Sequence, residues 1–294
     1  MKSSNGLETA PLWLAILGSL RLTVALQCLG NWGWLSQSGE TPLLHWIINP
    51  ADIGGLHWNE ANALILQQTL GWLALLSGVC VLFRPCAAVL GPLVLLQLVL
   101  AIAMWQNADG FPLSADLLPA EWVTLFPFLT QSARIAAPLG LLLLDPWRTP
   151  RPLSEKRTFC AMTLLRWAIA ITFLAHGIES WQLNPHFIDL LIGASSNILG
   201  VNLPQTNAEH ILSLIGAVDI LLAILCVTTK SRWVLGWMAL WGALTAISRI
   251  FVWGISFWHM GLVRVPHMTL PLIVFLYLHL LQCRQEKSEA YITW

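Results

Sequence analysis

The chain has 294 residues, of which 56% are hydrophobic and 10% are charged, and its formal net charge is zero. Globular soluble chains usually contain about 45–50% apolar and about 25% charged residues, so this composition argues against a soluble protein. The balanced charge and the absence of a long basic run argue against nucleic acid as a partner.

Long apolar segments follow one another along the whole chain. Most of them reach the roughly 20 residues that a helix needs to cross a bilayer. A segment in lipid must satisfy its backbone amides internally, so we predict an all-α integral membrane protein with about eight transmembrane helices that contact membrane lipid. In chain order, the predicted spans are residues 11–35, 63–83, 87–105, 122–144, 158–181, 210–229, 233–258 and 268–283, the last beginning near Val265.

Basic residues are distributed unevenly between the predicted connections. Residues 36–62, 106–121 and 182–209 contain no Lys or Arg, and Arg264 is the one basic residue in the last connection on that side. Cytoplasmic loops carry an excess of Lys and Arg, so we expect both termini in the cytoplasm. The expected location is the inner membrane of the cell, which the chain crosses several times. The connections on the opposite side contain Arg84, Arg148, Arg151, Lys156, Arg157, Lys230 and Arg232.

The two halves of the chain match at a constant offset. A shift of 145 residues places Arg21 on Arg166 and Gly71 on Gly216. Such self-similarity predicts a tandem repeat of four-helix units, and an even number of spans gives both units the same, parallel orientation. The predicted organisation is a first, degenerate unit in residues 1–147, a cytoplasmic linker in 148–157, and a second unit with the buried charges in 158–294.

The alignment of the two units also pairs polar positions. Asn31 matches His176, Trp34 matches Glu179, Ala74 matches Asp219 and Met104 matches Arg249. After a shorter connection in the second unit, Arg134 matches His267 and Pro138 matches Pro271. The second unit therefore holds most of the ionisable groups.

Five ionisable residues of the second unit form the candidate site. A charge at the centre of a span costs about 2.5–3.5 kcal/mol, so its retention needs a reason. The helix directions place four of the residues in the outer half of the unit, with Asp219 beneath them. Two interpretations remain open: an ionic staple in which Asp219 or Glu179 neutralises Arg249, or a polar pocket for a small molecule or for protons. The candidate residues are His176, Glu179, Asp219, Arg249 and His267.

Other charged residues have simpler interpretations. Arg21 and Arg166 are expected to be structural charges, with Arg166 reaching toward the inner membrane surface. Arg134 has no acidic partner within its own unit. His176 and His267 lack the local spacing typical of metal ligands, so no metal site is predicted, and no motif identifies a catalytic residue.

The second unit resembles the DoxX-like family, which includes the DoxD subunit of thiosulfate:quinone oxidoreductases and MauE-like proteins. The resemblance rests on an Arg near the start of the first helix of the unit, the sequence FLAHGIESW at the outer end of that helix, a long outer loop, and then IGAVDILLAILCV. Residues 165–283 carry it best, and residues 20–144 resemble a degenerate second copy.

The resemblance implies a membrane subunit or accessory protein of a redox system, with a redox subunit as protein partner and quinone as the cofactor to consider. Any enzymatic role would be that of a non-autonomous subunit of a quinone-linked oxidoreductase, because no residue of the chain supplies electrons. In that role His176 or Asp219 would exchange protons and Arg249 would stabilise the reduced oxygen. The alternatives are a transporter or exporter of a small solute, in which Pro138 and Pro271 kink equivalent helices, and a non-catalytic membrane scaffold.

Overall fold

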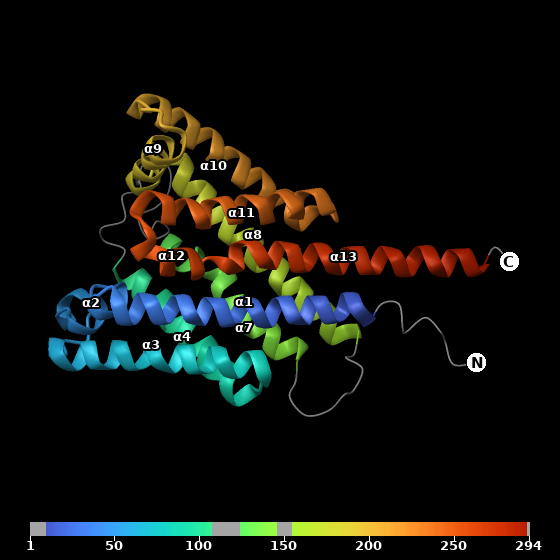
Figure 1. Ribbon diagram of the computed structural model, residues 1–294, viewed down its shortest axis with the longest axis horizontal. Helices are drawn as coiled ribbons and strands as arrows, with labels where there is room; N and C mark the ends of the chain where they lie inside the picture. Colours follow the sequence, from blue (N-terminus) through green and yellow to red (C-terminus); the bar gives the residue numbers. More distant parts are fainter. Residues whose placement is uncertain (1–9, 108–123, 146–154, 293–294) are drawn as a thin grey trace.

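The computed structural model describes residues 10–107, 124–145 and 155–292 (Figure 1). Most of the predicted connection 106–121, the start of the fourth predicted span and most of the predicted linker 148–157 lie outside these residues. Within them the chain forms helices and no β-strand, and eight helical stretches are long and apolar enough to cross a membrane. The prediction of an all-α chain with eight such stretches is confirmed. They are Leu12–Gln37, Glu60–Phe83, Ala87–Gln106, Phe126–Leu144, Glu155–Trp181, Gln205–Thr228, Arg232–Trp253 and Val265–Cys283.

We refer to the described residues before 146 as the first half and to those after 154 as the second half. The long helices of the first half are α1 (Ala10–Gln37), α3 (Glu60–Phe83), α4 (Ala87–Gln106) and α7 (Ser132–Leu144), preceded by the short α6 (Phe126–Leu129). Those of the second half are α8 (Glu155–Trp181), α10 (Gln205–Thr228), α11 (Arg232–Trp253) and α13 (Val265–Ile292).

Three further short helices lie at one end of the bundle, which we call the cap end. They are α2 (Pro42–Ile48), α9 (Pro185–Leu199) and α12 (Trp258–Leu262), and the 3-10 turns Ala51–Ile53 and Ile255–Phe257 accompany them. The start of α1 and the end of α13 lie at the opposite end, which we call the terminal end (Figure 1).

The segments of these cap-end helices are predicted as loops from the apolar pattern, although local helix signals for two of them are present. Thr41 caps α2 by accepting a hydrogen bond from Leu44 N at 3.2 Å, and Asn184 caps α9 through His186 N at 3.0 Å. A proline follows each cap, where its missing N–H does no harm. The predicted seventh span, 233–258, is too long, since α11 ends at Trp253 and Gly254 turns the chain with a φ of 88°.

The four helices α1, α7, α8 and α13 form the centre of the molecule. Within the halves, α1 packs on α3 and α8 on α10, while α7 packs on α4 and α13 on α11. Between the halves, α7 packs on α8 and α1 packs on α13. The side chains at the centre are tightly buried and apolar, and include Ile16, Leu20, Leu141, Leu165, Ile169 and Leu270.

The outer helices expose large apolar side chains. Trp72 on α3, Leu221 and Ile224 on α10, and Trp237 and Leu240 on α11 are at least half exposed. Soluble monomers rarely expose an apolar surface of this extent, whereas lipid tails accept it. The helices are therefore suited to contact with membrane lipid, as expected for a multi-pass membrane protein.

Glycines allow the closest helix contacts. A Cβ atom added at Gly216 of α10 would lie 2.5 Å from the backbone nitrogen of Trp181 and 2.7 Å from the carbonyl oxygen of Gly177, both on α8. Gly71 of α3, the matched position, lies against the side chains of Leu35 and Ser36 of α1. Small residues at such contacts let two helix backbones approach in a membrane.

The two matched arginines both bind helix ends. Arg21 forms an ion pair with Asp145, the residue that ends α7. Arg166 donates to the carbonyl oxygens of Cys226 and Thr229 at the end of α10. A cation near the C-terminus of a helix interacts favourably with the partial negative charge there. Both arginines thus connect neighbouring helices toward the terminal end.

Candidate binding pocket between the two halves

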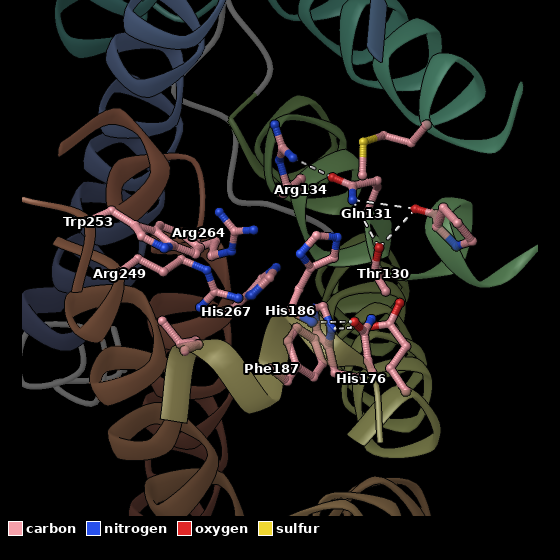
Figure 2. Close-up of a pocket in the computed structure, with 15 residues that line it drawn as sticks. Thr130, Gln131, Arg134, His176, His186, Phe187, Arg249, Trp253, Arg264 and His267 are labelled. Atoms are coloured by element: carbon pink, nitrogen blue, oxygen red, sulfur yellow. Dashed lines mark hydrogen bonds and ion pairs between the residues drawn. The ribbon is translucent and has the colours of Figure 1, made fainter. Parts of the chain in front are cut away.

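A cavity of about 210 Å³ lies toward the cap end, between the two halves (Figure 2). The side chain of His186, at the start of α9, is exposed and marks its opening. The polar residues that line the cavity from the first half are Thr130, Gln131 and Arg134, and those from the second half are His176, Glu179, Asn184, His186, Arg249, Arg264 and His267.

The wall from the first half begins where the fourth span is interrupted between α6 and α7. Thr130 and Gln131 form the turn, and Thr130 Oγ1 donates to the carbonyl oxygen of Pro127 at 2.9 Å. One turn later, Arg134 donates to Gln131 Oε1 and, at 3.2 Å, to Asn31 Oδ1 of α1. The interruption therefore exposes an amide and a guanidinium group to the cavity.

The backbone carbonyl of Arg134 makes a further contact, which is possible because of Pro138. Pro138 lies four residues later in α7 and has no N–H, so it cannot donate to the carbonyl oxygen of Arg134. Gln27 of α1 supplies the missing donor, with its Nε2 at 2.9 Å from that oxygen. The Arg134 guanidinium also lies 5.4 Å from the centre of the Trp34 ring, a cation–π contact.

The wall from the second half contains the histidine–carboxylate pair. His176 Nδ1 and Glu179 Oε2 are 2.9 Å apart, as residues three apart on a helix allow. The His176 ring lies 5.6 Å from the ring of His267 on α13. Pro271, four residues after His267, likewise removes a helical donor, and the His267 carbonyl packs against Gly242 of α11.

Two further arginines complete this wall. Arg249 Nη1 donates to Thr245 O at 2.6 Å, and Arg264 Nη1 donates to Met260 O at 2.8 Å. Both interact electrostatically with Glu179 without reaching ion-pair distance. Burial lowers the pKa of Arg264 to about 10, and Glu179 opposes this effect, so Arg264 stays protonated at neutral pH.

The structure brings four of the five predicted site residues to this cavity and excludes the fifth. His176, Glu179, Arg249 and His267 line it, whereas Asp219 does not and instead interacts with Trp241 of α11. The depth expected for Asp219 did not specify which neighbour its side chain meets. The predicted ionic staple is not formed, since Arg249 makes no ion pair with either Glu179 or Asp219.

The sequence predicts a pocket within the second unit alone, and this prediction is wrong, because residues of both halves line the cavity. Thr130, Gln131 and Arg134 contribute one wall from the first half, and Arg264 and His186 were not among the predicted site residues. Arg264 carried a usable signal, because it was the one basic residue in the connections on its side. His186 carried none, because a histidine in a loop is usually solvated.

Comparison of the chain with protein-family models, with curated proteins and with solved structures finds no match. Among the described residues, no group of three or more His, Cys, Asp or Glu side chains is arranged to hold a metal ion.

Proposed function

We propose that the chain consists of two tandem four-helix units in parallel orientation, which bind a small solute in the pocket between them and pass it across the membrane. The observation that carries this proposal is that both halves line one buried polar cavity. Binding sites of secondary transporters are commonly found at the interface of structural repeats.

Equivalent helix contacts support the tandem arrangement. The contacts of α1 with α3, α2 with α4, and α4 with α7 correspond to those of α8 with α10, α9 with α11, and α11 with α13. Between the halves, α1 on α13 corresponds to α7 on α8. This is the pattern expected when two copies of one unit pack around a two-fold axis.

Equivalent polar positions support a shared pocket. The alignment of the units pairs Asn31 with His176 and Arg134 with His267. In space, Arg134 binds Asn31 and the rings of His267 and His176 are in contact. The two matched positions are thus in contact within each half, and in each half a proline follows four residues after the second position. Arg134, His176 and His267 line the cavity, and Asn31 lies behind Arg134 as its hydrogen-bond acceptor.

A buried polar stripe continues from the pocket into the bundle. Asn31, Gln27 and Thr23 lie four residues apart on α1 and are almost completely buried. Thr23 Oγ1 donates to Thr269 Oγ1 of α13 at 2.8 Å, and Gln27 donates to α7. Beyond Thr23 the interface is apolar, beginning with Leu20 and Ile16. This suits a solute path that is open at the cap end and closed at the terminal end.

The charge distribution supports an orientation in the membrane. Outside the cavity, the described basic residues lie toward the terminal end, among them Arg84, Lys156, Arg157, Lys230 and Arg232. By the positive-inside rule the terminal end, with both termini, faces the cytoplasm of an inner membrane and the pocket opens outward.

Cysteine labelling in sealed vesicles tests the transport proposal without knowledge of the solute. In a variant without the six native cysteines, we expect Thr130→Cys to react with an impermeant anionic thiosulfonate from the cap side, and more slowly from the terminal side when the two units move. Ser196→Cys, on the exposed surface of α9, should react from the cap side only. Reaction of Thr130→Cys from the cap side alone would contradict transport.

A second candidate function follows from the side chains at the pocket wall that can exchange protons. His176, hydrogen-bonded to Glu179 and in contact with His267, is placed to exchange protons with a bound molecule. This feature favours a quinone-binding subunit that docks a redox partner, the role that the resemblance to DoxX-like proteins implies. Such a subunit needs no second opening, so one-sided labelling of Thr130→Cys is its expected result.

A further inference from the structure

We infer that the ligand of the pocket is a small oxyanion, a molecule that presents a carboxylate or phosphate group to the three arginines. The inference rests on the proposed function only in taking this cavity as the ligand site. It holds for a transporter and for a binding subunit alike.

The first support is the charge of the cavity. Among the described residues, Arg134, Arg249 and Arg264 are the arginines that do not lie toward the terminal end, and all three line this one cavity. Glu179 is the single carboxylate in the lining, and none of the three arginines has a described carboxylate within 4.0 Å. The lining therefore holds an excess of two positive charges even when its histidines are neutral. In a bilayer such an excess is strongly unfavourable without an anion to balance it.

The second support is a set of unused buried polar atoms. Arg134 Nε, Arg249 Nε and His267 Nε2 are each buried and have no hydrogen-bond partner. Leaving a buried donor unpaired costs about 1–3 kcal/mol, and more when the group is charged. An oxyanion between these side chains would accept hydrogen bonds from the two guanidinium groups and bring its charge to them.

The arrangement of the side chains limits where such an anion would bind. Arg249, Arg264 and His267 lie together on one side of the cavity, and Arg134, Gln131 and Thr130 lie on the other (Figure 2). His267 interacts electrostatically with all three arginines. Glu179, the single carboxylate of the lining, is hydrogen-bonded to His176.

The size of the cavity limits the anion. A volume of about 210 Å³ is below the roughly 300–1,000 Å³ of pockets that take drug-sized ligands. Phe187, Leu190 and Trp253 add an apolar wall beside the arginines. Inorganic phosphate and short organic acids fit this description, as does the phosphate of a lipid headgroup that enters from the bilayer.

The test is calorimetric titration of the purified full-length protein at low salt, with inorganic phosphate, succinate and choline chloride as probes. We expect phosphate or succinate to bind and choline not to bind. Arg249→Gln and Arg134→Gln should each weaken the binding at least tenfold, and Arg249→Lys should weaken it less. Arg232→Gln removes an arginine at the terminal end, where it contacts His279, and should leave binding unchanged.

The outcomes separate the sources of the anion and the two proposals. Inhibition of probe binding by phosphatidylglycerol in nanodiscs, with no effect of phosphatidylcholine, assigns the site to an anionic headgroup. Binding of choline, or binding of neither phosphate nor succinate to the protein in phosphatidylcholine nanodiscs, overturns the inference. Unchanged anion binding in Arg249→Gln and Arg134→Gln variants that melt as the parent does would overturn it as well. Anion binding together with one-sided labelling of Thr130→Cys leaves the inference standing and removes the transport proposal.

Discussion

Replacing Gly216 with alanine is expected to destabilise the protein by about 1–3 kcal/mol or more, because the new Cβ atom overlaps the backbone of α8. The obstructing atoms belong to Trp181 and Gly177 and cannot rotate away as a side chain would. The helices must separate, and the contact between α8 and α10 is lost along its length.

The matched control is Gly236→Ala on α11, where no atom lies within 4 Å of the added Cβ. Alanine is a better helix former than glycine, so this variant should be neutral or more stable by about 0.5–1 kcal/mol. Thermal melting in detergent, followed by tryptophan fluorescence, measures both. Equal effects of the two substitutions would contradict the close approach of α8 and α10.

Replacing Gln27 with leucine is expected to destabilise the protein by about 1–3 kcal/mol, since the Arg134 carbonyl oxygen then has neither a helical nor a side-chain donor. The expected effect depends on Pro138. In a Pro138→Ala background the alanine N–H can donate to Arg134, so the same Gln27→Leu change should have a smaller effect.

A double-mutant cycle measures this coupling directly. The control cycle combines Gln27→Leu with Pro92→Ala instead of Pro138→Ala. Pro92 lies inside α4, whereas Gln27 donates its hydrogen bond to Arg134 of α7. We expect the Gln27–Pro138 cycle to be non-additive and the Gln27–Pro92 cycle to be additive. Additive behaviour in both cycles would show that Gln27 does not compensate for the proline.

These contacts show why the sequence predicts the spans well and the pocket less well. A transmembrane helix can be predicted from the composition of one continuous segment. The eight apolar segments were therefore predicted without information about their neighbours in space. The contact between His176 and Glu179 was equally accessible, because their spacing on one helix places them on the same face. The depth expected for each ionisable residue followed from the direction expected for its helix, and it stays a prediction.

Contacts between helices depend on rotation about each helix axis, which the sequence does not specify. Asp219 was expected beneath the pocket, but the orientation of α10 directs it to Trp241. Arg134 lacked an acidic partner in the sequence because its partners are neutral: Asn31, Gln131 and the Trp34 ring. Neutral partners of a cation have no charge pattern by which to recognise them.

The first half contributes to the pocket although it contains few of the candidate ionisable residues. Most of the candidate ionisable groups belong to the second half, yet α7 of the first half completes the cavity through Arg134. A single four-helix unit would leave this wall missing. The account therefore predicts that the second half alone does not reproduce the site.

The central claim is that the two halves pack against each other along α1 and α13 beneath the pocket. Oxidative cross-linking of Thr23→Cys with Thr269→Cys, in the variant without native cysteines, tests it most directly, because the two hydroxyl oxygens are 2.8 Å apart. The account predicts rapid cross-linking within one chain, and none between Thr23→Cys and Ile247→Cys on the exposed face of α11. Failure of the first pair to cross-link, or a cross-link only between chains, would contradict the packing that creates the pocket.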